Sequence, residues 1–199
     1  MDVNNPKESK RDLIMDAAIQ VFSRKGYHHS KMEEIAVEAG IGKGTIYEYF
    51  PGKLQLLQEI MEQSYRLYDH SLGSIMAGGT LEDKLDAMIR GHLQFCQDNK
   101  DLTRILFLDT GVIDEELRQW AWKKKAEKEQ YLQEMFAQAT RRGEIKPVDN
   151  RLLTIVMGGI LMSFWAPIVM GNLQVDAGTA AQQIKNMIMH GISNTKGSD

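Results

Sequence analysis

Apolar positions recur at helical spacing from near the start of the chain. Between Ser9, which can cap a helix, and Lys25, one apolar stripe repeats every three or four residues, and Gly26 then ends the pattern. The stripe consists of Leu13, Ile14, Ala17, Ala18, Val21 and Phe22. This spacing predicts a long amphipathic helix that buries one face.

Two shorter helices are predicted next. Ser30 and Glu33 have the spacing of a capping box, in which a hydroxyl and a carboxylate satisfy free backbone N–H groups, so a helix is expected from residue 31. Gly40 stands where the chain must leave that helix with a positive φ. A third helix is expected over residues 43–50, because Pro51 cannot continue the ladder of backbone hydrogen bonds.

Helical spacing continues through the rest of the chain with almost no strand signal. The sequence therefore predicts an all-α protein. Thr80 and Asp83 offer a further cap. The additional helices are expected over residues 54–72, 81–97, 102–108, 114–142, 152–170 and 179–192.

The two short helices and the glycine between them match the helix-turn-helix pattern, whose second helix enters the DNA major groove. A plain helical hairpin gives the same local signal, but here a long helix precedes it, which makes a three-helix DNA-binding domain possible. Ile46 and Tyr49 are expected on the buried side, and Phe50 also suits the core better than a contact. The exposed side then consists of Lys43, Gly44, Thr45, Tyr47 and Glu48.

Several spaced elements in residues 9–60 carry a more specific signal. They are Ile14-x-x-Ala17-Ala18-x-x-x-Phe22, Gly26-Tyr27, Ile35-Ala36-x-x-Ala39-Gly40, Gly44-Thr45-Ile46-Tyr47-x-Tyr49-Phe50 and Lys53-x-x-Leu56. Together they resemble the N-terminal DNA-binding domain of the TetR family of bacterial transcriptional regulators. Lys31 stands where that family often has a hydroxyl residue, and Tyr49 where it often has His. The remaining two-thirds of the chain resembles the family in length and helical character.

The resemblance and side-chain chemistry together imply a set of DNA contacts. Lys43 can donate to guanine O6 and N7, Thr45 can contact a thymine methyl group or a base edge, and Gly44 lets the backbone approach closely. Phosphate contacts, which set the register without reading sequence, are expected from Ser30, Lys31, Tyr47 and Lys53. For Tyr47 a core position is the alternative.

Charge does not single out this region as a DNA-binding one. Residues 1–60 hold eight Lys or Arg and nine Asp or Glu, and the 199-residue chain has a formal net charge of −3. Nucleic-acid binders usually have a basic patch, so phosphate contacts must come from a few cations and from helix N-termini. Glu33, Glu34 and Glu38 are therefore expected to face away from the DNA.

Other chemistries have little support. Gly42-Lys43-Gly44-Thr45 resembles the end of a P-loop, but Val37 occupies the place of its first glycine and no strand leads in. The sequence has no H-E-x-x-H motif, nucleophile elbow or paired Cys or His at metal-ligand spacing, so no catalytic residue, metal or cofactor is predicted. The single Cys96 and an N-terminus without a secretory pattern predict a cytoplasmic protein.

Residues 152–170 contain no charged side chain and are nearly long enough to cross a bilayer. A membrane span is one interpretation. The family resemblance instead implies a dimerising helix here, paired with the last helix, and small residues would let two backbones approach closely. No membrane association is therefore predicted. The expected interface residues are Leu153, Gly158, Gly159, Ser163, Ile184 and Ile188.

The region after the DNA-binding domain is rich in Met and aromatic residues, which can line an adaptable cavity or simply fill a helical core. The resemblance implies that a small apolar or amphipathic effector binds there and releases DNA by changing the spacing of two DNA-binding heads. His92 and Arg104 are polar candidates for holding it, although His92 equally suits a satisfied core histidine. The apolar candidates are Phe95, Phe107, Trp120, Met157, Met162 and Trp165.

These observations predict a DNA-binding domain over residues 1–53 and an effector-binding and dimerisation domain over residues 54–199. One helix-turn-helix reads too few base pairs for useful specificity, so a homodimer on palindromic double-stranded DNA is expected. The resemblance implies a ligand-responsive repressor that is not an enzyme. A helical dimer with an unrecognised enzymatic or purely structural role is the alternative.

Overall fold

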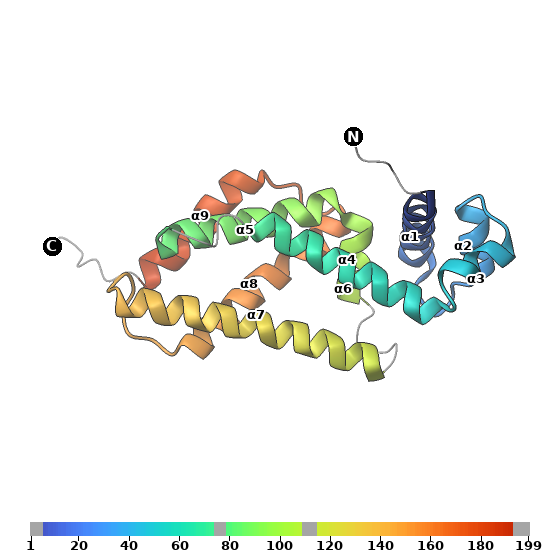
Figure 1. The fold of residues 1–199 in the computed structure, drawn as a ribbon. Helices are drawn as coiled ribbons and strands as arrows, with labels where there is room; N and C mark the ends of the chain where they lie inside the picture. The colour runs from blue at the N-terminus through green and yellow to red at the C-terminus, as the bar shows by residue number, and fades with distance from the viewer. Residues whose placement is uncertain (1–5, 74–78, 109–114, 193–199) are drawn as a thin grey trace. The chain divides into compact units, whose positions relative to one another are not determined.

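A computed structural model describes residues 6–73, 79–108 and 115–192 of the chain. Within these residues it contains nine α-helices and no β-strand, which confirms the all-α prediction (Figure 1). The helices are α1 (Pro6–Lys25), α2 (Met32–Glu38), α3 (Lys43–Tyr49), α4 (Lys53–Gly73), α5 (Leu81–Asp98), α6 (Lys100–Leu108), α7 (Glu115–Arg141), α8 (Asn150–Val169) and α9 (Ala177–Ile192).

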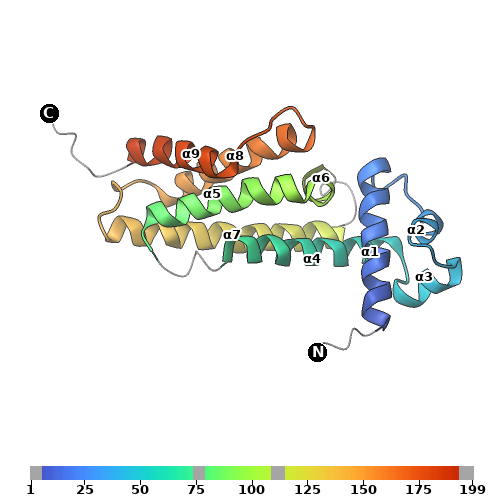
Figure 2. The same ribbon diagram turned by 90° about the horizontal axis from the view of Figure 1, so that it is seen from above.

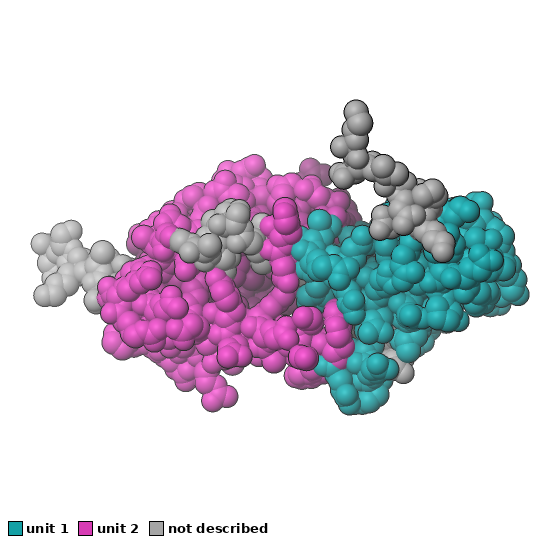
Figure 3. All heavy atoms as spheres, viewed as in Figure 1, with its two compact units in different colours: residues 1–67, 101–119 teal, residues 68–100, 120–199 magenta. Residues whose placement is uncertain are grey.

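The chain divides into two compact units (Figure 3). Unit 1 comprises residues 1–67 and 101–119, and unit 2 comprises residues 68–100 and 120–199. The long helices α4 and α7 each contribute residues to both units. The domain boundary expected after residue 53 stays a prediction.

Unit 1 is built on the apolar stripe of α1, which packs against α2, while α2 packs against α3. The predicted stripe is confirmed except at Leu13, which is half exposed. Side chains from all three helices and from α4 are almost completely buried, because each helix turns its apolar face inward. They are Ile14, Ile35, Ile46, Phe50, Leu56, Leu57, Ile60 and Met61.

The predicted capping box at the start of α2 is wrong. Ser30 is buried, and its hydroxyl donates to the carbonyl of Gly26 at 2.6 Å, so it does not cap the helix. Lys31 is the cap position instead, and its backbone N–H donates to the Glu34 carboxylate at 3.2 Å. The positive φ predicted for Gly40 is confirmed at 67°.

Unit 2 is organised around α5, which packs against α8 and α9 (Figure 2). The capping box predicted at Thr80 and Asp83 is confirmed at the start of α5. Three elements other than α5 contribute to the apolar core, which explains why its residues lie far apart in sequence. Prominent members are Leu85, Ile89, Leu93, Phe136, Met157, Leu161, Ala181 and Ile184.

α8 is the one helix of the described residues that is long and apolar enough to cross a membrane. Thr154, Met157, Leu161, Ile168 and Val169 on one of its faces are buried within this chain. The opposite face is exposed and apolar. The apolar length of α8 thus reflects two faces with different surroundings, as a helix between a core and a partner surface requires.

Candidate DNA-binding, dimerisation and effector sites

Contacts on its inner side fix the position of α3. Ile46 is completely buried, and Phe50 closes the end of the helix as a buried cap residue. Arg11 of α1 donates to the backbone carbonyl of Tyr49 at 3.1 Å, pairs with Glu59 of α4, and stacks 4.4 Å from the centre of the Phe50 ring. α3 therefore packs against α2 and is fixed at its C-terminal end by Arg11 of α1.

The outward side of α3 presents the residues that the sequence suggested for DNA. Lys43, Gly44 and Tyr47 are exposed and Thr45 is half-buried, so the alternative core position for Tyr47 does not hold. A Cβ atom on Gly44 would meet nothing within 4 Å. Since glycine disfavours a helix and no neighbour in the chain excludes a side chain here, the fold gives no reason for Gly44.

The acidic residues of α2 pair with cations of the same unit. Lys25 of α1 pairs with Glu34 at 2.8 Å, and Arg24 pairs with Glu38. Glu33 pairs across the helix-turn-helix with Lys43 of α3 at 2.9 Å. This hydrogen bond lowers the pKa of Glu33 and raises the pKa of Lys43. The prediction that Glu33 faces away from the α3 contact surface is therefore wrong.

Ser30 and Lys53 lie in the support of the helix-turn-helix. The Lys53 ammonium donates to the backbone carbonyls of Tyr27 at 2.6 Å and Ser30 at 2.8 Å, and it lies 4.3 Å from the centre of the Tyr27 ring. Partial burial lowers the pKa of Lys53. Both side chains are thus engaged in holding the segment between α1 and α2, whereas Lys31 is exposed.

His92 is buried in unit 2 with both ring nitrogens bonded. The Tyr68 hydroxyl lies 2.9 Å from Nδ1, and Nε2 lies 2.9 Å from the backbone carbonyl of Leu161. Because a carbonyl only accepts, Nε2 carries the proton and Nδ1 accepts from Tyr68. Burial lowers the pKa of His92 to about 4, with a smaller contribution from Lys128. His92 therefore links α4, α5 and α8 as a neutral core histidine.

Lys128 of α7 completes this polar cluster. Its ammonium lies 4.2 Å from the centre of the Tyr68 ring and pairs with Asp69 at 3.1 Å. Burial lowers the pKa of Lys128, which Asp69 partly offsets. Lys128 was not among the polar candidates that the sequence suggested, because a lysine in a strongly charged helix gives no sign of burial.

The remaining effector candidates have different surroundings. Phe95 and Met157 are buried, and the Phe95 ring meets the Tyr68 ring edge-on at 5.1 Å between centres. Trp120 and Trp165 are half-buried, and Met162 is exposed. The side chain of Phe107 lies outside the described residues. Only part of the predicted set therefore lies in the interior of unit 2.

Arg104 belongs to unit 1 rather than to the interior of unit 2. Its guanidinium lies 3.2 Å from the hydroxyl of Ser23 in α1, and that hydroxyl also bonds to Asp101 of α6. These contacts tie α6 to the end of α1. They give Arg104 a structural partner that the sequence did not indicate.

An apolar strip runs along the exposed side of α8. Gly159 belongs to this strip and Gly158 is half-buried at its edge, and a Cβ atom on either would meet nothing within 4 Å. Among the predicted interface residues, Ile184 is buried in the core of unit 2, and Leu153 and Ile188 pack against that core. The exposed strip itself comprises Leu152, Ile155, Val156, Gly159, Met162 and Ser163.

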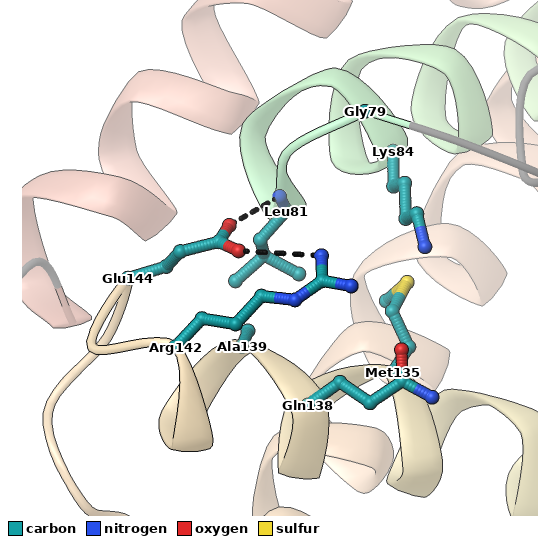
Figure 4. A pocket seen from close by; sticks show the side chains of 8 residues that line it. All are labelled: Gly79, Leu81, Lys84, Met135, Gln138, Ala139, Arg142 and Glu144. Carbon is teal, nitrogen blue, oxygen red and sulfur yellow. Dashed lines mark hydrogen bonds and ion pairs between the residues drawn. The ribbon is translucent and has the colours of Figure 1, made fainter.

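A small pocket lies between the start of α5 and the end of α7 (Figure 4). The Glu144 carboxylate accepts from the backbone N–H of Leu81 at 2.6 Å and lies 3.8 Å from Arg142. The protein's own carboxylate thus occupies the helix N-terminus there. Among the described residues no cluster of three or more His, Cys, Asp or Glu is arranged to hold a metal ion.

Two family models match the chain, and both describe the same family. The model for bacterial regulatory proteins of the tetR family matches residues 14–60, which span the helix-turn-helix. The model for the tetracyclin repressor-like C-terminal domain matches residues 78–165. Together the two matches include the α3 surface and most of the unit 2 core.

Individual relatives match the chain almost end to end. A fatty acid metabolism regulator protein of Bacillus subtilis is 26% identical over 190 residues, covering 94% of this chain and 98% of the relative. The crystal structure of FadR from Bacillus subtilis in complex with stearoyl-CoA has 26% identity and a TM-score of 0.77, covering 91% and 98% of the two chains.

A further solved structure supports the same fold. The structure of the fatty acid degradation regulator FadR from Bacillus halodurans has 26% identity and a TM-score of 0.78, covering 92% of this chain and 95% of that chain. The matched domains and their order agree with the exposed α3 and the helical unit 2. This protein is accordingly a member of the TetR family of bacterial transcriptional regulators.

Proposed function

We propose that this protein is a repressor whose homodimer binds a palindromic operator through α3 and releases it when a fatty acyl-coenzyme A binds. The observation that carries the proposal is the α3 surface, where Lys43 and an otherwise unexplained Gly44 face outward on a firmly held helix. Repression by occlusion of the promoter is adopted by analogy with the family.

We assign DNA contacts to the exposed residues of the helix-turn-helix. Lys43 donates to a guanine edge, Thr45 contacts a base edge or thymine methyl group, and Gly44 allows the DNA backbone to come close. Lys31 and Tyr47 contact phosphates and fix the register. Exposure of Lys31, Lys43 and Tyr47 supports these roles.

Ser30 and Lys53 take a different role in this proposal. Their side chains are engaged with backbone carbonyls of residues 26–30. We therefore assign them to bracing the segment before α2, which places Lys31 at the cap position. In this proposal Ser30 and Lys53 therefore do not make the phosphate contacts that the sequence predicted for them.

The dimer interface is assigned to the exposed strip of α8. Leu152, Ile155 and Val156 are 61%, 67% and 56% exposed in the single chain, which is unfavourable for apolar side chains in water. Gly159 and Ser163 would allow close approach of a second copy.

The effector is assigned to the acyl-coenzyme A class. The Bacillus subtilis regulator, which matches this chain almost end to end, is solved with stearoyl-CoA. Phe95, Met157 and Trp165 supply apolar surface inside unit 2 of this chain. His92 is not a free anchor for the ligand, because both its ring nitrogens are already bonded.

This repressor acts in the cytoplasm, where both operator DNA and acyl-coenzyme A occur, and its function needs no catalytic residue, metal or cofactor. Exposed apolar residues of α8 face a second copy rather than lipid. Their alternation with the buried residues of the same helix supports a single exposed side.

Selection of bound duplexes from random DNA by the purified protein tests the DNA-binding assignment. We expect enrichment of a palindrome by the unaltered protein and loss of that enrichment with Lys43→Ala. Lys125→Ala, which removes an exposed lysine of α7 outside the helix-turn-helix, serves as the matched control and should leave the enrichment unchanged. Failure to enrich any sequence at low and moderate salt would favour the alternative, a helical dimer with an enzymatic or purely structural role.

A further inference from the structure

Glu33 of α2 pairs with Lys43, the first residue of α3. We propose that Glu33 determines specificity by holding the Lys43 ammonium away from the phosphates of non-operator DNA and releasing it to a guanine edge in the operator. This inference rests on the proposed DNA-binding role of α3 and adds a residue that does not itself contact DNA.

The geometry of the pair allows such competition. The Glu33 carboxylate lies 2.9 Å from the Lys43 ammonium, and the two side chains are 45% and 67% exposed. Both groups are therefore accessible from the outer surface of the helix-turn-helix. The mutual pKa shifts, downward for Glu33 and upward for Lys43, agree with a formed ion pair.

The pair also differs from the other ion pairs of α2. Glu34 and Glu38 pair with Lys25 and Arg24 of α1, whereas Glu33 reaches α3. Among the ion pairs of the described residues, the Glu33–Lys43 pair alone engages a cation of α3. One carboxylate is thus directed at the one Lys of α3 (Lys43–Tyr49).

Guanine bases and phosphates of DNA both compete with Glu33 for the Lys43 ammonium, but they do not displace Glu33 equally well. An exposed ion pair is weak, so a better partner displaces it. A guanine offers two acceptors, O6 and N7, at a fixed position in the major groove. A phosphate offers the gain from counterion release at any sequence, and Glu33 offsets that gain and adds repulsion. The ion pair consequently lowers non-operator affinity more than operator affinity.

Titration of salt in binding measurements with two duplexes tests the inference. One duplex carries the selected operator and the other a scrambled sequence of the same length and composition. For Glu33→Gln we expect scrambled-duplex affinity to rise about two- to fivefold, the strength of one exposed ion pair. The slope of log affinity against log salt should steepen by about 0.9 for one added phosphate contact. Operator affinity should rise less, so the ratio of the two affinities falls.

The matched control is Glu38→Gln, which removes the same charge from the same helix but releases Arg24 instead of Lys43. It should leave the affinity ratio within about twofold of the unaltered protein. The Glu33→Gln effect should vanish in a Lys43→Ala background, because no ammonium remains to be released. Thermal unfolding of each variant verifies that the helix-turn-helix is intact.

Two results overturn the inference. One is a Glu33→Gln protein whose ratio of operator to scrambled-duplex affinity is unchanged, whether both affinities stay the same or rise equally, and the other is a gain that persists in the Lys43→Ala background. Failure of the underlying function has a separate signature, because the unaltered protein would then show no preference for any duplex over its scrambled form. If the unaltered protein prefers the operator and either of these results is found, the role of Glu33 is refuted but the DNA-binding function is not.

Discussion

At the scale of single residues, a substitution of Gly44 should change the stability of the fold and the affinity for DNA in opposite directions. It lies within α3, its φ is ordinary, and a Cβ atom would meet open space. Gly44→Ala should therefore raise the free energy of unfolding by up to about 1 kcal/mol, through helix propensity. The same methyl group should clash with DNA and weaken operator binding at least about fivefold, since overpacking costs about 1–3 kcal/mol.

Chemical denaturation and operator titration of the Gly44→Ala protein measure the two effects. Gly191→Ala is the matched control, because a Cβ there also meets nothing within 4 Å and the residue lies at the end of α9. Unchanged operator affinity in Gly44→Ala would contradict the close approach of DNA to this helix.

His92 predicts a pH dependence of folding. Burial lowers its pKa to about 4, below the ordinary value near 6.5, so the unfolded chain binds the proton more tightly. The stabilising contribution is complete above about pH 6.5 and is lost as the pH falls toward 4, with a maximum of about 3 kcal/mol. The groups that contact the ring or act on its charge are Tyr68, Cys96, Lys128 and the backbone carbonyl of Leu161, which opposes part of the pKa shift.

Denaturation of the unaltered protein and of His92→Gln at pH 7 and pH 4.5 isolates this contribution. We expect the unaltered protein to lose more stability than the variant between these two pH values. An equal loss in the two proteins would show that other groups control acid unfolding.

The roles of Lys53 and Ser30 could not be predicted from the sequence, because their side chains bind backbone carbonyls. Lys53 donates to the carbonyls of Tyr27 and Ser30, more than 20 positions earlier in the chain, and backbone acceptors leave no sequence signature. Ser30 was mistaken for a cap because its hydroxyl can satisfy either a helix N-terminus or the Gly26 carbonyl. Gly40, whose conformation depends on local backbone geometry alone, was predicted correctly.

At the scale of helices, periodicity predicted where each element lies but not what its outer face meets. The apolar α8 was found from composition, and its buried and exposed faces follow from packing against α5. Ile184 and Ile188 were expected at the dimer interface, yet their side chains fill or cover the core of unit 2. A single helix pattern does not say which of two apolar faces meets a neighbour within the chain.

The exposed strip of α8 predicts the effect of a charge. Ile155 is 67% exposed in the single chain, so Ile155→Glu should leave the fold intact and place a carboxylate in the shared interface. Because a buried unpaired charge is costly, we expect the dimer dissociation constant to rise at least about tenfold. Analytical ultracentrifugation over a concentration series measures this change.

Trp122→Glu provides the control for Ile155→Glu. Trp122 is 64% exposed on α7, outside the proposed interface, and receives the same charge. Its dimer dissociation constant should stay unchanged. A stable dimer in Ile155→Glu would move the interface away from this strip of α8.

At the scale of the whole molecule, binding of the effector must weaken binding of DNA, and binding of DNA must weaken binding of the effector. A ligand that releases the operator does so because it binds more tightly to the DNA-free state, and the operator then weakens the ligand by the same factor. The family membership establishes a regulator with a helix-turn-helix and a helical C-terminal domain. The chemical class of the effector is the part that the sequence left open, since Met and aromatic residues suit many apolar ligands.

The most direct test follows the fluorescence anisotropy of a labelled operator duplex bound by the dimer while stearoyl-CoA is added. We expect the anisotropy to fall to that of free DNA with stearoyl-CoA, while coenzyme A without an acyl chain leaves the complex intact. A complex unaffected by acyl-coenzyme A of short, medium and long chains, although it binds the operator specifically, would contradict the proposed effector class.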